Sequence, residues 1–451
     1  MKNFIKFLKT DIKIINSYFL LAVIFIILIS IGYSSYALFS FTKTSTNVIE
    51  ATVGKIEKKP NAPVLASNMI PVYYDETAET WKKADLANPN NTYKWYDYNN
   101  GMWANAVTVT SSSRSKYLNA SIGTVISMND ITTMWVWIPR FNAVTPSNYN
   151  GGTKEKPNAI DVTFVKQNET AIDAFTFGDK ELSGFWYGKF EIGGTLASSC
   201  TNETCNVSNI VVKPNVSSLK KQKVSSFFYA SRSMEQTGNS FGFKKDEVDT
   251  HMSKNNEWGA VAYLTHSVYG RCTSSTTCSE VGINNNDSYI TGYGAPAGSG
   301  ETVANGAYNT TLGKGATTTG TIYGIYDMSG GSWEYVMGVR ADTNGKPRSG
   351  YSSSYNSGFT GMLKDGTTYT GITFPDSKYY NLYTGSSYTG HALTETKNWY
   401  GDYAYFVYSG GPWFIRGGYY DGSTSAGVFD FEFDSGDSLG TYSSRSVISN
   451  K

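Results

Sequence analysis

The sequence predicts an α+β protein built mainly from short strands, turns and loops. Aromatic residues make up 15% of the 451-residue chain, which has 34 Tyr and 45 Gly but only 12 Pro. This mixture is typical of short strands, tight turns and aromatic-rich loops rather than of long helices. A hydrophobic content of 40% is too high for general disorder. A chain of this length is expected to hold roughly two or three domains.

The N-terminal segment has the pattern of a membrane anchor. A basic tail, residues 1–17, precedes an apolar segment, residues 18–41. As a helix the apolar part would be roughly 33 Å long, which is enough to cross the hydrocarbon core of a bilayer. Lysines on its N-terminal side favour an N-inside, single-pass protein in the cell membrane, with the C-terminal domain extracellular. A cleaved signal peptide is the alternative, because Ser35-Tyr36-Ala37 fits a cleavage site.

Composition divides the rest of the chain into three parts. Residues 42–66 are polar, lack periodicity and end near a Lys-Lys-Pro-Asn-Ala-Pro stretch, which predicts a stalk. Alternating apolar and polar residues with turn signals predict a small β module over residues 67–130. Its aromatic residues suit a sugar-stacking face, but such residues are more often the core of a small sheet. The sequence predicts one large binding domain over residues 131–451.

Four segments of the large domain have clear patterns. Residues 134–141 and 184–192 are apolar and predict buried strands. Residues 218–238 predict an amphipathic helix, and residues 254–270 predict a helix that begins near Asn255 or Asn256. From Gly270 to Gly390 the chain is rich in Gly, Ser, Thr, Asn and Tyr. Such long loops usually carry function or cover a rigid core.

The four cysteines form two local pairs, Cys200 with Cys205 and Cys272 with Cys278. The short polar segments between the partners make loops that one disulfide each can close in an oxidising setting. Pairing between the two loops is the alternative. A zinc site is disfavoured, because CxxC spacing is missing and no histidine lies beside either pair in the sequence.

The C-terminal residues alternate cleanly over six positions. Phe429, Phe431 and Phe433 would point to one face of a strand, and Asp430, Glu432 and Asp434 to the other. We expect the phenylalanine row to be buried and the acidic row to face solvent or a ligand. Spacing of about 6.6 Å along one strand is too wide for these carboxylates to share one calcium ion.

Other chemistry finds little support. With 38 Lys and Arg against 37 Asp and Glu, the chain has no surplus of cations for a nucleic-acid surface. Its three histidines lie in no metal-binding motif, so no metal or other cofactor is expected. The run Asn284-Asn285-Asn286-Asp287 offers oxygen ligands for a structural calcium ion, although such residues more often build turns.

Several motifs resemble one protein family. GIYDMSGGSWEYVMG, residues 324–338, resembles the GLYDMSGNVWEW signature of the formylglycine-generating-enzyme/sulfatase-modifying domain. NNEWGAVAYL, GFWYGKFEI and WFIRGGYYDG resemble the helix, an early strand and the Arg-Gly-Gly strand of that family. The resemblance covers residues 134–448 and implies an α+β, C-type-lectin-like domain of the sulfatase-modifying-factor type. The family usually ends in a GFR strand, and SSRSVI in its place leaves the register of the final strand open.

Enzymes of that family oxidise a peptide cysteine with copper and a pair of cysteines near the Arg-Gly-Gly strand. This chain has no cysteine after Cys278, and Tyr419, Tyr420 and Asp421 follow Arg416-Gly417-Gly418. Tyr and Asp cannot replace the thiolates that this chemistry requires. We therefore expect the protein not to be an enzyme, and an oxidase of this type is the disfavoured alternative.

The chain also resembles a non-catalytic branch of the family, the variable proteins of diversity-generating retroelements. This resemblance implies a ligand-binding adhesin or receptor whose diversified surface lies in residues 413–445. The expected partner is a protein or glycan on another cell, a virus or the matrix, and a structural surface protein is the alternative. The residues that the resemblance implies for ligand binding are Trp413, Tyr419, Tyr420, Asp421, Ser423, Ser425, Asp430, Glu432, Asp434, Asp437, Ser438 and Tyr442.

Overall fold

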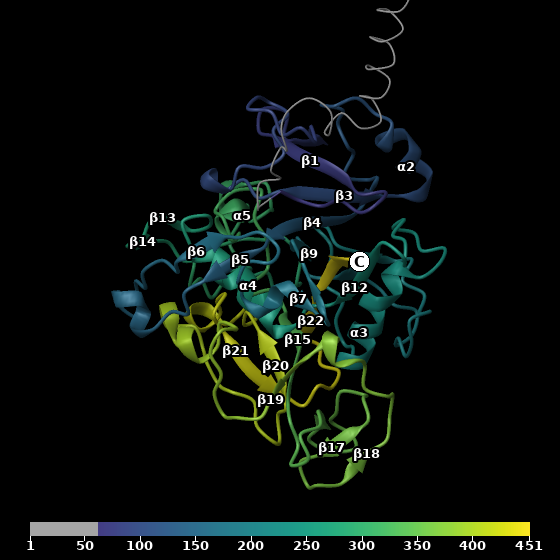
Figure 1. The fold of residues 1–451 in the computed structure, drawn as a ribbon, viewed down its shortest axis with the longest axis vertical. Helices are drawn as coiled ribbons and strands as arrows, with labels where there is room; N and C mark the ends of the chain where they lie inside the picture. The colour runs from purple at the N-terminus through teal and green to yellow at the C-terminus, as the bar shows by residue number, and fades with distance from the viewer. Residues whose placement is uncertain (1–61) are drawn as a thin grey trace, which may run out of the picture. The chain divides into compact units, whose positions relative to one another are not determined.

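A seven-stranded antiparallel sheet organises the part of the chain that the computed structural model describes, residues 62–451 (Figure 1). The C-terminal strand β23 lies inside this sheet, between β12 and β9, rather than at its edge. In spatial order the strands are β12 (Val248–Met252), β23 (Ser446–Asn450), β9 (Gly184–Gly188), β4 (Ile131–Pro139), β3 (Asn105–Val109), β1 (Ile70–Asp75) and β2 (Thr80–Lys83).

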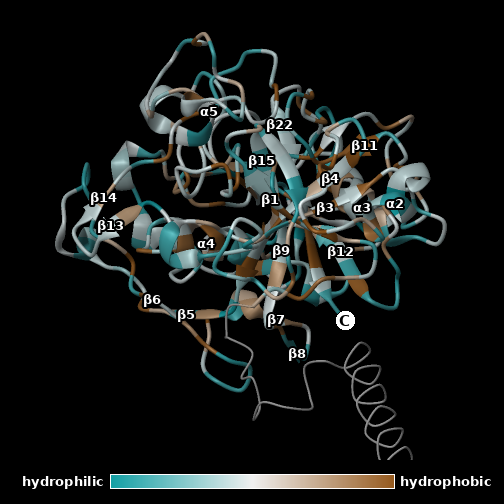
Figure 2. Ribbon diagram, turned by 90° about the horizontal axis from the view of Figure 1, so that it is seen from above, coloured by the Kyte–Doolittle hydropathy of each residue, from teal (hydrophilic) through white to brown (hydrophobic). Residues whose placement is uncertain are grey.

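The predicted buried strands are confirmed as β4 and β9, which pair with each other near the middle of the sheet. All five residues of β9 are buried, and so are the last seven of β4. A strand that is buried on both faces reads as a continuous apolar run, which explains the sequence signal. Hydrophobic residues gather on the central strands, whereas many of the surrounding loops are hydrophilic (Figure 2).

Residues 67–130, which we predicted as a small β module, extend the same sheet. The strand β3 pairs with β4 from Asn105 opposite Val136 to Val109 opposite Ile131, so backbone pairing continues across residue 130. Residues 60–451 belong to one compact unit. The module's tryptophans Trp81, Trp95 and Trp103 are buried in this unit and are not available as a sugar-stacking face.

A second sheet holds the motifs of the C-terminal half. Its strands are β19 (Asn381–Tyr383), β15 (Trp333–Arg340), β20 (Trp413–Arg416), β21 (Phe431–Asp434) and β22 (Tyr442–Ser444). The strand β15 pairs antiparallel with β20, and both β19 and β22 run parallel to it. The strand β21 lies antiparallel to β20. Segments 80 to 110 residues apart in the chain thus become neighbours.

The two predicted helices are confirmed as α3 (Val224–Arg232) and α4 (Asn255–Thr265), although α3 is shorter than expected. The helix α4 begins where predicted, because the Glu257 carboxylate accepts the Lys254 backbone N–H at 2.8 Å. All 11 residues of α4 are buried. Gly259 is required there, since a Cβ would lie 2.5 Å from the backbone of His391.

Short elements complete the fold. The other α-helices of the described residues are α2 (Ser111–Leu118) and α5 (Thr311–Gly315). The small ribbons are β5 (Phe141–Ala143) with β6 (Val162–Phe164), β7 (Thr176–Phe177) with β8 (Lys180–Glu181), β10 (Gly193–Gly194) with β11 (Ile210–Val211), β13 (Cys272–Ser274) with β14 (Thr277–Cys278), and β16 (Arg348–Gly350) with β17 (Gly361–Leu363) and β18 (Thr368–Tyr369). The 3₁₀ helices are η1 (Tyr98–Asn100), η2 (Asn148–Gly151), η3 (Asp173–Phe175), η4 (Ser233–Glu235), η5 (Ser377–Tyr379), η6 (Thr394–Thr396), η7 (Trp399–Gly401) and η8 (Ser423–Ser425).

The predicted local disulfides are confirmed. Cys200 is bonded to Cys205 and Cys272 to Cys278, so the alternative pairing between the two loops does not occur. Each bond closes a short loop and removes conformational freedom from the unfolded chain.

The predicted membrane location is contradicted. Within residues 62–451 no helix is long and apolar enough to cross a bilayer. The longest helix described, α4, has 11 residues, whereas a membrane span needs about 20. The segment predicted to span the membrane, residues 18–41, lies outside the described residues, as do the basic tail and most of the predicted stalk. We therefore do not retain the prediction of a single-pass membrane protein.

A buried ion pair connects the two sheets. The guanidinium of Arg445, between β22 and β23, pairs with the carboxylate of Glu334 in β15, and both side chains are almost completely buried. The same guanidinium donates to the backbone oxygens of Gly188, at the end of β9, and Tyr326, at 2.9 and 3.0 Å. The register of the final strand, left open by the sequence, is therefore set by a residue that contacts both sheets.

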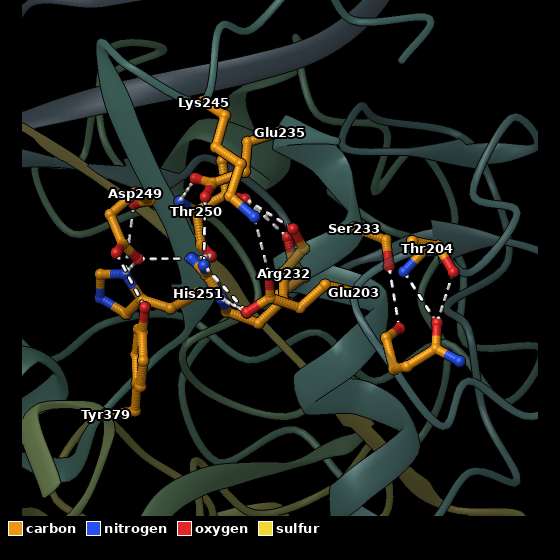
Figure 3. Close-up of polar contacts among 12 residues, drawn as sticks. Glu203, Thr204, Arg232, Ser233, Glu235, Lys245, Asp249, Thr250, His251 and Tyr379 are labelled. Carbon is orange, nitrogen blue, oxygen red and sulfur yellow. Dashed lines mark hydrogen bonds and ion pairs between the residues drawn. The ribbon is translucent and has the colours of Figure 1, made fainter. Parts of the chain in front are cut away.

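A second buried ionic cluster holds α3 against β12 (Figure 3), and an adjacent pair joins β12 to α4. Arg232 of α3 pairs with Asp249 at 2.6 Å and with Glu235 at 3.1 Å. Next to it, the imidazole of His251 lies 3.0 Å from the carboxylate of Glu257. Burial alone would lower the pKa of His251, but the Glu257 and Asp249 carboxylates outweigh this effect and raise it.

Removing β23 should prevent folding. Val447 and Ile448 are completely buried, and without them β12 and β9 would each lose a paired neighbour inside the sheet. We expect a chain that ends at Arg445 to lack a cooperative thermal unfolding transition measured by circular dichroism. Deletion of the exposed Lys451 alone is the control and should keep the transition. A normal transition in the chain ending at Arg445 would show that the assigned strand order is wrong.

Stability should fall as the pH rises from 5 to 8. Burial raises the pKa of Glu280 to about 7 and that of Asp327 to about 6, and nearby arginines offset only part of this effect. Folded protein then holds protons that the unfolded chain has released, so stability is full below the unfolded pKa values and is lost as the pH passes the folded ones. His251, whose folded pKa is also raised, acts in the same direction. His266, whose pKa burial lowers to about 4, acts in the opposite direction and offsets part of the fall.

The measurement is the free energy of unfolding in urea at several pH values. Glu280→Gln cannot ionise and should show a weaker pH dependence than the wild type. A stability that stays constant or increases over this interval would contradict the assigned environments of these groups.

Candidate functional site

The structure divides the predicted ligand-binding residues into a buried group and an accessible group. The buried residues are Trp413, Asp430, Asp437 and Tyr442. The partly or fully exposed residues are Tyr419, Tyr420, Asp421, Ser423, Ser425, Glu432, Asp434 and Ser438. The buried group is part of the scaffold, so it cannot contact a ligand without local unfolding.

Trp413 is a core residue, and its predicted ligand contact is not possible in this structure. Its side chain is 0% exposed, and its indole N–H donates to the backbone oxygen of Ser349 at 3.0 Å. The ring stacks on Phe374, with centroids 5.8 Å apart. The sequence shows a tryptophan near the Arg-Gly-Gly motif. It does not show that the distant ribbon β16–β18 covers this side chain.

Asp430 also departs from the prediction. The alternation begins only at Phe431, where β21 starts, and Asp430 is 1% exposed. Burial, together with the Glu432 and Asp402 carboxylates, raises the pKa of Asp430 well above its ordinary value. Within β21 the expected faces are present: Phe431 and Phe433 lie on one side and Glu432 and Asp434 on the other. Phe433, however, is only partly buried.

Five aromatic side chains form a continuous cluster, which we call the tyrosine surface: Tyr289, Trp333, Tyr419, Tyr420 and Tyr442. Tyr289 and Tyr442 are buried and support the other three rings, which are partly exposed. The ring of Tyr419 stacks on Trp333 with centroids 4.3 Å apart. Tyr420 meets Tyr419 edge-on at 5.4 Å and Tyr289 at 5.1 Å. Tyr442 packs edge-on against the other partner of the stack, Trp333, at 5.7 Å. Such contacts favour fixed ring positions.

Two glycine-rich motifs place these rings together. Gly417 and Gly418 leave β20 with φ of 86° and 72°, a conformation that favours glycine. A Cβ on Gly418 would lie 2.5 Å from Ala426, which also demands glycine. The Gly417 carbonyl accepts the Gly330 N–H at 2.9 Å, and the Gly331 carbonyl accepts the Tyr420 N–H at 2.9 Å. These bonds align the Arg-Gly-Gly turn with the segment that precedes Trp333.

The acidic residues nearby have different roles. Asp434 accepts hydrogen bonds from the hydroxyls of Tyr335 and Tyr442 and from the Gly436 N–H, so its carboxylate is occupied by the scaffold. Glu432 is partly exposed, and no side chain of residues 62–451 donates to it or pairs with it. Burial raises the pKa of Glu432 above its ordinary value. Its charge contributes to the raised pKa values of Tyr419 and Tyr442.

The remaining accessible residues lie on two loops. Exposed Asp421 and Ser425 are between β20 and β21, and exposed Ser438 is between β21 and β22. Ser423 donates its hydroxyl to the backbone oxygen of Gly298 at 2.8 Å, which holds the short helix η8 against a neighbouring loop. Two members of the surface, Tyr289 and Trp333, were not predicted. Trp333 lies in the Ser-Gly-Gly-Ser-Trp motif, whose position next to the Arg-Gly-Gly turn was the available signal, whereas Tyr289 carries no signal in the sequence.

Other chemical clusters in the described residues have structural explanations. His266 lies close to Cys272 and Cys278, but both sulfurs are in one disulfide and offer no thiolate. The side chains of Asn284 and Asn286 bond to nearby groups of their own turn and of Asp327. This matches the turn interpretation of the run at 284–287, and the calcium interpretation stays a prediction.

One relay has the layout of a catalytic triad. The Tyr383 hydroxyl lies 2.7 Å from His391 Nδ1, and His391 Nε2 lies 2.7 Å from Asp173. Burial raises the pKa of Tyr383 well above its ordinary value, so its hydroxyl stays protonated and is a weak nucleophile. Asn255 also donates to this oxygen. The relay connects α4, β19 and η3 and gives no evidence of catalysis.

No protein-family model and no curated protein sequence matches the chain. Among solved structures, Treponema denticola variable protein 1 is 13% identical, with 71% of this chain and 97% of that chain covered and a TM-score of 0.30. The Major Tropism Determinant U1 Variant is 12% identical, with 86% and 73% covered and a TM-score of 0.27. The M1 Variant is 14% identical, with the same coverage and TM-score as the U1 Variant. TM-scores this low carry no argument about the fold or function of this chain.

Replacing Trp413 should destabilise the protein. Trp413→Ala would open a large cavity in a packed region and remove one of the two donors of the Ser349 carbonyl. We expect a loss of about 3–5 kcal/mol in the free energy of unfolding, measured in urea. Tyr420→Ala, which truncates a partly exposed ring, is the comparison and should cost much less. A loss below about 1 kcal/mol for Trp413→Ala would contradict its assignment to the scaffold.

Proposed function

We propose that the protein is a non-enzymatic ligand-binding protein and that the tyrosine surface makes the contact. The observation that carries this proposal is the stack of Tyr419 on Trp333, presented by a glycine turn at the end of a buried strand. Tyr420, Asp421 and Glu432 surround the stack and remain accessible. Tyrosine offers a large contact area with few rotatable bonds, and its hydroxyl keeps the surface polar.

The rigidity of the scaffold supports this function. A ligand gains affinity when the surface that it meets is already ordered, because less conformational entropy is lost on binding. Here the turn that carries Tyr419 and Tyr420 is held by two backbone bonds to the segment before Trp333. The turn leaves β20, which itself lies between β15 and β21. The accessible rings are therefore preorganised.

The chemistry of the resembled enzymes has no counterpart in these residues. All four cysteines of the chain are in disulfides, and the positions after the Arg-Gly-Gly motif hold Tyr419, Tyr420 and Asp421. A thiol pair for copper-dependent oxidation is thus not supplied near the tyrosine surface. This supports binding over oxidation as the role of the surface.

We propose further that the domain is C-type-lectin-like and that its exposed C-terminal positions are diversified, as the motif resemblance implies. The separation of roles within residues 413–445 supports this finer proposal. Substitution at Tyr419, Tyr420 or Asp421 changes the surface and leaves the hydrogen bonds of the scaffold in place, because the turn is held by backbone groups. Buried residues such as Phe431 allow no such freedom.

Replacing Tyr419, Tyr420 and Asp421 with Ala should reduce binding and leave folding intact. Random peptides displayed on phage and selected on the full-length protein provide the probe, and their affinities are then measured by calorimetry. Loss of tyrosine contacts at the centre of an interface costs about 2 kcal/mol or more, so we expect affinity to fall by about thirtyfold. The unfolding temperature should change little.

Tyr93→Ala is the matched control, because Tyr93 is an exposed tyrosine that packs on Tyr73, outside the tyrosine surface. It should leave the affinity unchanged. If the triple variant binds the selected peptides as tightly as the wild type does, the contact surface lies elsewhere.

A further inference from the structure

The Glu432 carboxylate has no cationic partner among residues 62–451. Cross-strand register places Glu432 opposite Ile415, which in turn lies opposite Tyr335, so these side chains share one face of the second sheet. Trp333 and Tyr442 lie on the same face, because they are opposite each other and Trp333 is two residues from Tyr335. Tyr335 is covered by Phe227 of α3, whereas Trp333 and Glu432 remain partly exposed.

No group of residues 62–451 compensates the charge of Glu432. Two buried acids of the protein show what such a charge gains from a cation: Glu334 pairs with Arg445, and Asp249 pairs with Arg232. For Glu432, loss of water raises the pKa, and no hydrogen bond or ion pair lowers it. A partly desolvated carboxylate at a surface gains most from a partner that brings the missing positive charge.

The adjacent rings add a second attraction for the same kind of group. Tyr419 and Trp333 present aromatic faces and edges beside Glu432, and aromatic faces attract ammonium and guanidinium groups. The surface already contains one internal example: the ammonium of Lys220 lies 3.2 Å from the ring centroid of Tyr289. Lys220 thus occupies Tyr289, and no cation of residues 62–451 lies over the ring of Tyr419 or Trp333.

Resting on the proposed function, we propose that the tyrosine surface recognises a basic side chain, arginine or lysine, of a protein partner, which binds between Tyr419 and Glu432. Arginine fits best, because its planar guanidinium can stack on an aromatic ring while its N–H groups bond to a carboxylate. Exposed Asp421 extends the negative charge along the same turn. A neutral or acidic glycan would leave the Glu432 carboxylate uncompensated.

A double-mutant cycle between protein and peptide tests this inference. Peptides are selected from the displayed library on the full-length wild type, and each arginine of a selected peptide is replaced with citrulline, which keeps the shape but removes the charge. We expect selected peptides to contain arginine or lysine and to lose about tenfold in affinity when the contacting arginine becomes citrulline. With Glu432→Gln the same replacement should have little effect, because the charge pair is already removed.

Glu79→Gln is the matched control, since Glu79 is exposed in the turn between β1 and β2 of the first sheet, outside the tyrosine surface. It should keep the full citrulline effect. The unfolding temperature of Glu432→Gln should equal that of the wild type. The loss of the citrulline effect in this variant then reflects recognition and not a change in folding.

The outcomes separate this inference from the proposed function. Peptides that lose affinity in the Tyr419, Tyr420 and Asp421 triple variant, but contain no basic residue or tolerate citrulline, would overturn the cation claim and keep the surface. Retention of a glycan array component that depends on Tyr419, with no peptide selected, would overturn the protein partner and keep the surface. Peptides that bind the triple variant normally, or no retention of any probe by the wild type, would overturn both.

Discussion

The buried pair between Arg445 and Glu334 connects the two sheets on which the rest of the structure depends. Arg445 follows β22 and precedes β23, so its position fixes one strand in each sheet. Its guanidinium also donates to the end of β9. Removing either partner would leave an unpaired buried charge, which costs about 3–5 kcal/mol. The pair therefore links the C-terminal strand order to the start of β15.

The candidate site is built on the same connection. Trp333 precedes Glu334, and Tyr442 precedes Arg445 by three residues. Pairing of β15 with β22 places these two rings opposite each other, close to the ion pair in the sequence. The Arg-Gly-Gly turn then adds Tyr419 and Tyr420 through backbone bonds. In this arrangement the buried part of the second sheet carries the Arg445–Glu334 pair and Phe431. Its accessible part carries Tyr419, Tyr420 and the Glu432 carboxylate. Stability and recognition are thus assigned to different side chains of the same strands.

Local patterns predicted the elements that depend on nearby residues. The apolar runs of β4 and β9, the start of α4 at Asn255 and both disulfides follow from composition and short-range spacing, and the structure confirms them. The alternation at Phe431 to Asp434 also predicted the correct faces of β21. These signals are strong because a strand buried on both faces, a helix start and a short disulfide loop each involve few residues.

Long-range contacts decided the rest. Trp413 looked accessible because the ribbon that covers it begins more than 60 residues earlier in the chain. Asp430 looked like part of the alternating strand, although β21 begins one residue later. Tyr289 joins the tyrosine surface only through the tertiary fold, and the insertion of β23 between β12 and β9 has no local signature. Register between distant strands is not encoded in any single segment.

Sequencing the codons for residues 413–445 across a growing population that carries this gene tests the central claim most directly, because it asks which positions are free to change. The account predicts substitutions at Tyr419, Tyr420, Asp421 and the other exposed positions of the segment, with Trp413 and Phe431 unchanged. Substitutions spread equally over buried and exposed positions, or a segment that never varies, would contradict a diversified surface on a fixed scaffold.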